Sequence, residues 1–257
     1  MSIYKNILIG INTFFPDWLS SIKQINKDHI IICDFEDKNL QNIIINKNID
    51  YFLPLSEKDY LLIKNQVDNR DKILYPSIET FNLLNNKLSF TNFMLENFKD
   101  NIPTVYYLDN KQLLNVQYPI ISKPIYSING IGIEIYHNNI EFLKCKKKII
   151  IQKFIEDEYE YSAYMLCING IIINYKIIKY KYEKYTIKKT NFPKNYEQVN
   201  YINIEIFEAI IMKLNYTGGL CIDFKFDNLI YIFEINPRFG GSAFTNNFIY
   251  DLLQIKN

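Results

Sequence analysis

The sequence predicts an α/β protein whose C-terminal part changes to an α+β arrangement. In residues 1–81, short apolar runs alternate with helical patterns, which predicts a parallel sheet. From residue 118 onward, apolar runs follow one another and are separated by turn signals such as Asn169-Gly170, which predicts antiparallel sheets. With 257 residues, of which 48% are hydrophobic, the chain can build one large domain or two modest ones.

The N-terminal elements alternate in type. Strands are expected at 6–11, 29–34 and 50–55, helices at 17–26 and 56–67, and the stretch 40–46 has a mixed pattern. Ser56 is followed by Glu57 and Asp59, the pattern of an N-cap with acids in the first helical turn. This order of elements predicts a sheet of parallel strands.

The later elements form two groups. Helices are expected at 78–84, 88–98 and 204–214, and a short one from about residue 243. Strands are expected at 104–108, 118–124, 132–136, 149–154, 159–167 and 171–180, followed by a terminal hairpin up to residue 236. In the helix 204–214, Ile206, Ile210 and Leu214 share one side, which is expected to be buried.

Composition excludes several classes of protein. The net charge of +1 gives no field that would attract nucleic acid or an anionic membrane, so neither is expected as a partner. No apolar stretch is long enough to cross a bilayer, and a soluble cytoplasmic protein is expected. Four cysteines lack CxxC spacing, and the two histidines are too few for a histidine-rich zinc site or a histidine-centred triad.

The most informative stretch is a hairpin near the C-terminus. A turn at Asp227-Asn228 gives three apolar pairs: Phe226 with Leu229, Phe224 with Tyr231, and Ile222 with Phe233. Because side chains alternate along a strand, the other face carries Asp223, Glu234 and Asn236. Two carboxylates and an amide oxygen are ligands suited to Mg²⁺. A solvated polar face is the alternative, but it gives no reason for the Pro237-Arg238-Phe-Gly-Gly run that follows.

A second stretch supplies positive charge beside glycines. Lys123 ends a buried strand and leads into a loop that contains Ser127, Gly130 and Gly132. Glycines let backbone amides approach an anion closely, and a lysine adds a point charge for phosphate. Arg238, just past the hairpin, offers a planar cation suited to the same ligand.

Together these stretches resemble the ATP-grasp superfamily, and within it the carboxylate–amine ligases of the carbamoyl-phosphate-synthetase type. The resemblance covers nearly the whole chain. It implies an N-terminal α/β pre-ATP-grasp domain at 1–81, then a two-lobed ATP-grasp fold at 82–257 whose small lid lobe spans about 114–153. The match departs from the family pattern at Asn101, where a glycine is usual, and at Gln152, where glutamate is frequent.

The resemblance also implies a role for each matching residue. Asp223, Glu234 and Asn236 match the metal ligands, and Arg238 and Lys123 match the catalytic cations. The residues that match nucleotide contacts are Lys87 and Lys123 for phosphate, Ser127, Gly130 and Gly132 for the lid loop, Gln152, Lys153, Phe154 and Ile155 for adenine, and Glu160 for ribose.

The expected activity is that of an ATP- and Mg²⁺-dependent ligase, with Mn²⁺ as an alternative metal. Such an enzyme activates a carboxylate as an acylphosphate, which an amine then attacks. The expected partners are therefore a small carboxylate and a small amine, and the sequence leaves a homodimer open. Two alternatives remain at this point: a phosphotransferase that stops after phosphorylating its acceptor, and a nucleotide-binding regulatory module without turnover.

Overall fold

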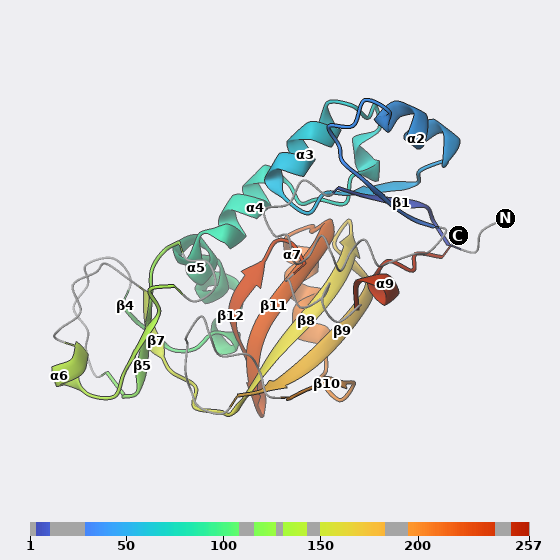
Figure 1. Ribbon diagram of the computed structural model, residues 1–257. Helices are drawn as coiled ribbons and strands as arrows, with labels where there is room; N and C mark the ends of the chain where they lie inside the picture. The colour runs from blue at the N-terminus through green and yellow to red at the C-terminus, as the bar shows by residue number, and fades with distance from the viewer. Residues whose placement is uncertain are drawn as a thin grey trace.

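The computed structural model describes residues 4–10, 29–107, 116–126, 131–142, 150–182, 195–239 and 248–256. Within them the chain forms one three-stranded parallel sheet and two antiparallel sheets of four and five strands. Figure 1 shows the five-stranded sheet between the parallel sheet on one side and the four-stranded sheet on the other. The mixed α/β class is confirmed, whereas the domain boundary at residue 81 stays a prediction.

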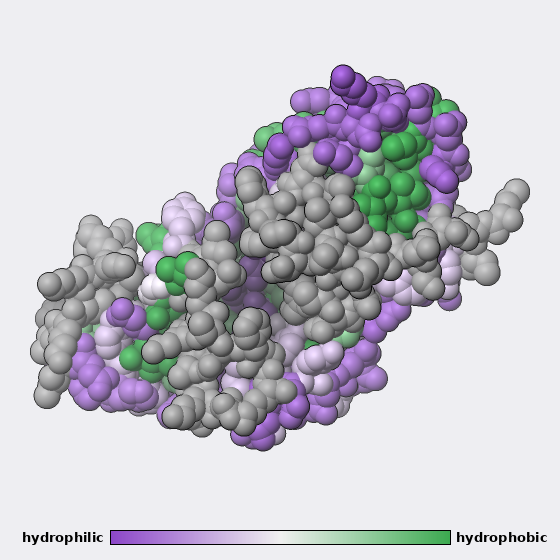
Figure 2. Space-filling model, in the orientation of Figure 1, coloured by the Kyte–Doolittle hydropathy of each residue, from purple (hydrophilic) through white to green (hydrophobic). Residues whose placement is uncertain are grey.

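The parallel sheet has the strand order β2-β1-β3, with β1 (Ile7–Gly10), β2 (Ile30–Cys33) and β3 (Tyr51–Leu53). Helix α3 (Glu57–Lys64) begins at the predicted cap, where Asp59 N donates to Ser56 Oγ at 3.1 Å. The stretch with a mixed pattern is helix α2 (Leu40–Asn46). The helix expected at 17–26 lies outside the described residues. Figure 2 shows a hydrophobic area at this sheet, bordered by hydrophilic residues.

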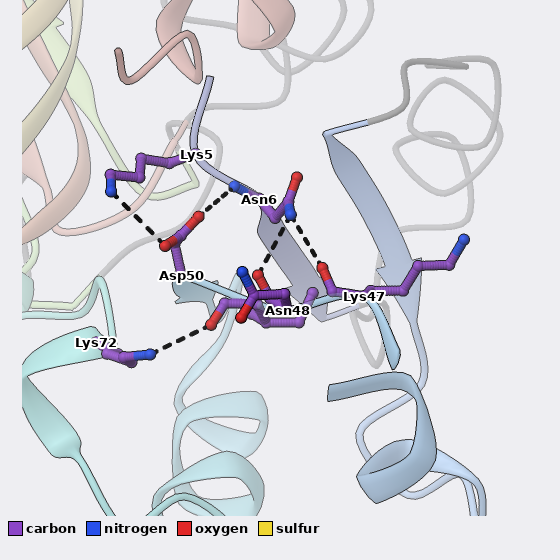
Figure 3. Close-up of polar contacts among 7 residues, drawn as sticks. Lys5, Asn6, Lys47, Asn48, Asp50 and Lys72 are labelled. Atoms are coloured by element: carbon purple, nitrogen blue, oxygen red, sulfur yellow. Dashed lines mark hydrogen bonds and ion pairs between the residues drawn. The ribbon is translucent and has the colours of Figure 1, made fainter. Parts of the chain in front are cut away.

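Polar contacts join the amino-terminal ends of β1 and β3 (Figure 3). Asn6 N donates to Asp50 Oδ2 at 2.8 Å, and Asn6 Nδ2 donates to the carbonyl oxygens of Lys47 and Asn48. Lys5 Nζ lies 3.8 Å from Asp50 Oδ1. Asn48 has a φ of 47°, so these contacts hold a tight turn whose backbone conformation asparagine tolerates better than most residues.

Two consecutive helices lead from the parallel sheet to the rest of the chain. α4 (Ile78–Asn85) is capped by Ser77, and α5 (Lys87–Asn97) by Asn86, each side chain accepting a backbone N–H of the first turn. Both helices agree with the sequence prediction. Short 3-10 turns flank them, η1 (Arg70–Lys72) before and η2 (Lys99–Asn101) after.

The four-stranded sheet has the order β4-β7-β5-β6. Its elements are β4 (Val105–Tyr107), β5 (Ile120–Lys123), β6 (Glu134–Tyr136), the short helix α6 (Asn139–Phe142) and β7 (Ile150–Lys153). One face carries a small apolar cluster of Ile120, Tyr136 and Ile151. Lys123 alternates with Ser122 and therefore points from the opposite face.

The five-stranded sheet has the order β10-β9-β8-β11-β12. Its elements are β8 (Tyr159–Ile168), β9 (Ile171–Lys181), β10 (Asn195–Val199), helix α7 (Glu205–Lys213), β11 (Gly218–Asp227) and β12 (Leu229–Asn236). The hairpin turn at Asn169-Gly170 is confirmed, with φ of 49° and 77°. The strand β10 was missed, because its Asn-Tyr-Glu-Gln-Val sequence has no regular apolar alternation.

Helices cover one face of the five-stranded sheet. Met94 of α5 and Phe207 and Ile210 of α7 are fully buried against sheet residues such as Ile222 and Phe224. The buried side of α7 centres on Phe207, with the predicted Ile206 and Leu214 only partly buried at its edges; the apolar side itself is confirmed.

The other face of this sheet is divided. At one end it packs against the parallel sheet and α9 (Phe248–Leu252) through residues that include Leu166, Ile178 and Phe239. The remainder of the face carries the polar side chains described below. The predicted start of the last helix, near residue 243, lies outside the described residues. Among the helices that are described, none has the length and apolar character needed to cross a membrane.

The terminal hairpin has a different register from the predicted one. The turn lies at Asn228, with a φ of 56°, and Phe226 pairs with Ile230 and Phe224 with Ile232. The predicted pairs of Phe226 with Leu229 and Phe224 with Tyr231 are therefore wrong. A turn with an odd residue count shifts the register by one, which exchanges the faces of the returning strand.

A β-bulge in β12 exchanges the faces again. The pairing changes from Phe224 with Ile232 to Asp223 with Glu234, so Phe233 is the extra residue. Ile222 consequently pairs with Ile235, and the predicted pair of Ile222 with Phe233 is also wrong. Beyond the bulge, Asp223, Glu234 and Asn236 share one face of the hairpin, as the sequence predicted.

Gly218 of β11 packs against the main chain of Leu74 and Tyr75, just beyond the parallel sheet, and this contact yields a stability prediction. Its φ is 122°, and a Cβ there would lie 2.9 Å from Leu74 O. We expect Gly218→Ala to lower the free energy of unfolding by roughly 3 kcal/mol, from backbone strain and a clash with main-chain atoms. Gly170→Ala is the control. Gly170 also has a positive φ, 77°, but a Cβ there would lie 3.3 Å from its nearest neighbour, Met212 Cα, so a loss of only about 1 kcal/mol in the free energy of unfolding is expected. Urea unfolding that ranks the two variants equally would contradict this account.

Candidate active site

The polar face of the hairpin gathers two acids and an amide. Asp223 lies directly opposite Glu234, and Cys221 lies opposite Asn236, so these four side chains share one face. Asn236 Nδ2 donates to Asp223 Oδ2 at 3.2 Å. The three residues predicted to bind a metal are thus neighbours, although Cys221 pairs with Asn236 and not, as the predicted register implied, with Glu234.

Asp223 is held by residues of two strands. Ser162, its cross-strand partner on β8, donates Oγ–H to Asp223 Oδ1, and Cys221 Sγ lies 3.5 Å from the same oxygen. Burial raises the pKa of Asp223 to about 6, the nearby Glu234 charge acts in the same direction, and the hydrogen bond from Ser162 opposes both. The two neighbouring acids therefore disfavour full ionisation, which a bound cation would restore.

Lys87 places a cation beside this acidic pair. It is the first residue of α5, it is buried, and its Nζ forms an ion pair with Glu234 Oε1. Its backbone N–H donates at 3.0 Å to the carbonyl oxygen of Ile125, just beyond β5. The lysine predicted to bind nucleotide therefore connects helix α5 both to the hairpin and to the end of β5.

Lys123 points at the bulge from the other sheet. It is the last residue of β5, and its Nζ lies 3.5 Å from Phe233 O and 5.4 Å from the centre of the Phe233 ring. Burial lowers the pKa of Lys123 to about 8, Glu234 opposes this shift, and Lys87 reinforces it. A buried ammonium next to another cation gains stability from an added anion.

Arg238 adds a third cation just past β12. Its Nη1 donates to Phe239 O at 3.3 Å. Burial lowers the pKa of the Arg238 guanidinium, while Cys221 and Glu234 oppose this shift. An arginine stays charged under these conditions. Two lysines and an arginine therefore surround the carboxylates of the hairpin.

Glu160 extends the polar face along β8. It precedes Ser162 by two residues and thus lies on the same side of the sheet. Burial raises the pKa of Glu160 to about 7, with Asp223 adding to the shift and Lys225 opposing it. Lys225 Nζ also lies 5.3 Å from the centre of the Phe154 ring. The residues predicted for ribose and for adenine thus have a common neighbour in Lys225.

The four predicted adenine residues point to different sides. Gln152 is buried on the face of the four-stranded sheet that also carries Lys123. Lys153 is exposed on the opposite face, so its side chain is separated from the others. Phe154 is buried and Ile155 partly buried. The Phe154 N–H donates to a carbonyl oxygen within the protein, so it is committed before any ligand binds.

The predicted glycine loop is described only at its end. Gly132 has a φ of 78°, a conformation that favours glycine, and a Cβ there would lie 3.4 Å from Pro124 Cγ. Ser127 and Gly130 lie outside the described residues. The roles predicted for them stay predictions.

Sequence reasoning missed two residues of this site, Ser162 and Lys225. Both could have been found by alternation, because Ser162 is two residues from Glu160, and Lys225 is two residues from Asp223. The required signal was the pairing of β8 with β11, which brings the two strands together although they are about 60 residues apart in sequence.

The donor set fits a hard divalent cation. Asp223 and Glu234 offer carboxylate oxygens, and Asn236 offers an amide oxygen once its amide turns over, since it presents nitrogen to Asp223. Within the described part of the chain, no cluster of three or more His, Cys, Asp and Glu side chains is arranged to hold a metal. A divalent cation held by these residues would therefore need the amide as its third protein ligand, with other oxygens completing its coordination.

The chain is similar to known proteins at the level of the family and of the fold. A family model described as an ATP-grasp domain matches residues 84–242, more than half of the chain. No curated protein sequence shows significant similarity.

Solved structures of low sequence identity share the fold. A D-alanine–D-alanine ligase from Bacillus anthracis is 14% identical with a TM-score of 0.57, and the match covers 97% of this chain and 94% of that chain. The same ligase complexed with ATP is also 14% identical, with a TM-score of 0.53 and coverages of 98% and 95%. An L-amino acid ligase from Bacillus licheniformis is 17% identical, with a TM-score of 0.55 and coverages of 95% and 69%.

The environment of Asp223 yields a prediction about pH. Its folded-state pKa of about 6 lies above the unfolded value of 3.8, so the unfolded chain loses this proton first. Raising the pH from about 4 to 6 should therefore destabilise the metal-free protein through this group, by up to about 3 kcal/mol. Asp223→Asn should remove this loss. The free energy of unfolding of the variant, relative to that of the wild type, should therefore be higher at pH 8 than at pH 4, as measured by urea unfolding. A stability difference that does not change with pH would contradict the assigned environment.

Proposed function

The chain belongs to the ATP-grasp family, and from this premise we propose that it is an ATP- and Mg²⁺-dependent ligase that joins a carboxylate to an amine through an acylphosphate. The observation that carries the proposal is the pairing of Asp223 with Glu234 beside Lys87, Lys123 and Arg238. Paired acids surrounded by cations suit a metal–polyphosphate complex, since the metal satisfies the acids and the phosphates satisfy the cations.

The nucleotide is proposed to lie between the two antiparallel sheets. Lys123 and Gly132, at the ends of β5 and β6, belong to the side that would cover the phosphates. Phe154 would pack on the adenine ring, and backbone groups of residues 152–155 other than the N–H groups of Lys153 and Phe154 would meet its polar edge, since those two already donate to Thr104 O and Pro119 O. Glu160 would accept hydrogen bonds from the ribose hydroxyls.

Asp223, Glu234 and Asn236 are the residues proposed to hold Mg²⁺. The metal would supply neutralisation of charge on the phosphates. Ser162 keeps Asp223 oriented by donating to Oδ1, which leaves Oδ2 toward Asn236. The orientation of the acid is therefore set within the protein, by the cross-strand pair of Asp223 on β11 with Ser162 on β8.

Lys87 is proposed to exchange partners when the nucleotide binds. Without ligand its ammonium neutralises Glu234. When a cation takes over Glu234, the buried ammonium needs a new anion, and a phosphate oxygen can provide it. Lys123 and Arg238 would stabilise the phosphoryl group as it moves to the substrate carboxylate, because phosphoryl transfer depends mainly on positioning and electrostatic stabilisation.

The test is a screen for ADP release over carboxylates and amines, followed by trapping. With the correct carboxylate and no amine, we expect slow ADP formation, a hydroxamate when hydroxylamine is added, and transfer of oxygen-18 from the carboxylate to phosphate. Release of AMP with unlabelled phosphate would contradict the acylphosphate. A stable phosphorylated product that no amine consumes would support the phosphotransferase alternative.

Glu234→Gln is the variant expected to lose activity in the ADP-release assay. We expect ADP formation to fall on the order of 100-fold or more, because one metal ligand loses its charge. Glu36→Gln is the control, since Glu36 also pairs with a lysine, Lys58 at 3.3 Å, but on an exposed surface. Equal activity in the two variants would show that Glu234 has no part in the reaction.

A further inference from the structure

Lys225 is a buried lysine that the mechanism above does not use. It lies on β11 two residues beyond Asp223, so it shares the polar face of the five-stranded sheet. Its exposed fraction is only 8%. Lysine is almost never buried to this extent without specific partners, so the contacts of its ammonium indicate what the position requires.

Three neighbours fix the ammonium of Lys225. Nζ donates to Asp157 O at 2.8 Å and lies 5.3 Å from the centre of the Phe154 ring. The preceding residue of β11 pairs with Tyr161, so Lys225 lies alongside Glu160 on β8. Burial lowers the pKa of Lys225, and the Glu160 carboxylate is the largest influence that opposes this shift.

These neighbours place the ammonium where a base and a sugar would meet. Phe154 is the residue proposed to pack on the base, and Glu160 is the acid proposed to bind the ribose. A carboxylate can only accept hydrogen bonds, and an ammonium can only donate them, whereas a sugar hydroxyl does both. A donor and an acceptor side by side therefore match a hydroxyl-bearing sugar better than a sugar without the hydroxyl.

We propose that Lys225 is a specificity-determining residue of the nucleotide site, whose ammonium donates to a ribose hydroxyl oxygen while Glu160 accepts from the ribose hydroxyls. The pair thereby selects ribonucleotides over deoxyribonucleotides. This inference rests on the proposed function, because it requires an adenine nucleotide in this site. A lysine that served only to anchor the backbone at Asp157 would affect all nucleotides equally.

The test compares the affinities of ATP, 2′-deoxy-ATP and 3′-deoxy-ATP in the presence of Mg²⁺ by titration calorimetry. The wild type should prefer ATP over at least one analogue. Lys225→Met should weaken ATP binding about tenfold, the size expected for one charge-assisted hydrogen bond, and leave the binding of that analogue nearly unchanged, so that the preference for ATP falls about tenfold, to the part that Glu160 supplies. Lys225→Gln, which keeps a neutral donor, is the second variant to measure if the methionine variant unfolds, and it should show a reduced preference.

Lys176→Met is the matched control. Lys176 also contacts an acid and an aromatic ring, Asp251 at 2.7 Å and Phe248 at 5.6 Å, but in the middle of β9, against α9. It should keep the wild-type preference. Equal losses of ATP and both analogues in the Lys225 variants, or a wild type that binds all three equally, would overturn the inference. A wild type that binds none of them with Mg²⁺ would instead overturn the proposed function.

Discussion

The bulge at Phe233 is the constraint on which the candidate site depends. The turn at Asn228 sets a register in which Glu234 would face the helices, and one extra residue in β12 turns it toward Asp223. The same extra residue presents its carbonyl oxygen to Lys123 from the other antiparallel sheet. A single irregularity in the ladder therefore both assembles the acidic pair and marks the point where the two sheets meet.

The charged groups near this bulge are only partly compensated, so that burial shifts the pKa values of two acids and a lysine toward their neutral forms. Burial and mutual repulsion hold the pKa of Asp223 near 6 and that of Glu160 near 7, while burial and Lys87 bring the pKa of Lys123 to about 8. The ion pair of Lys87 with Glu234 offsets only part of this unfavourable electrostatic energy. Such a set costs stability in the free protein, and the helix-covered face of the same sheet, with Phe207 and Phe224 fully buried, offsets that cost.

Much of this arrangement followed from the sequence, and the failures have identifiable causes. Alternation along β12 placed Glu234 and Asn236 on one face, and the cap at Ser56 located the start of α3. The pairing near the turn was wrong because Asp227-Asn228 resembles a two-residue turn, and nothing local in the sequence reveals the bulge. Lys225 was missed because its partners come from β8 and from the segment after β7, contacts that arise only when distant strands pair.

The most direct test of the central claim is titration calorimetry of ATP into the wild-type chain, with Mg²⁺ and then with the metal chelated. If Asp223 and Glu234 hold a metal that in turn binds the phosphates, ATP binding should weaken at least about tenfold without Mg²⁺, because the phosphates then face the Asp223 carboxylate and must compete with Glu234 for the Lys87 ammonium. Tighter ATP binding without Mg²⁺, or an affinity that does not depend on the metal, would contradict the account.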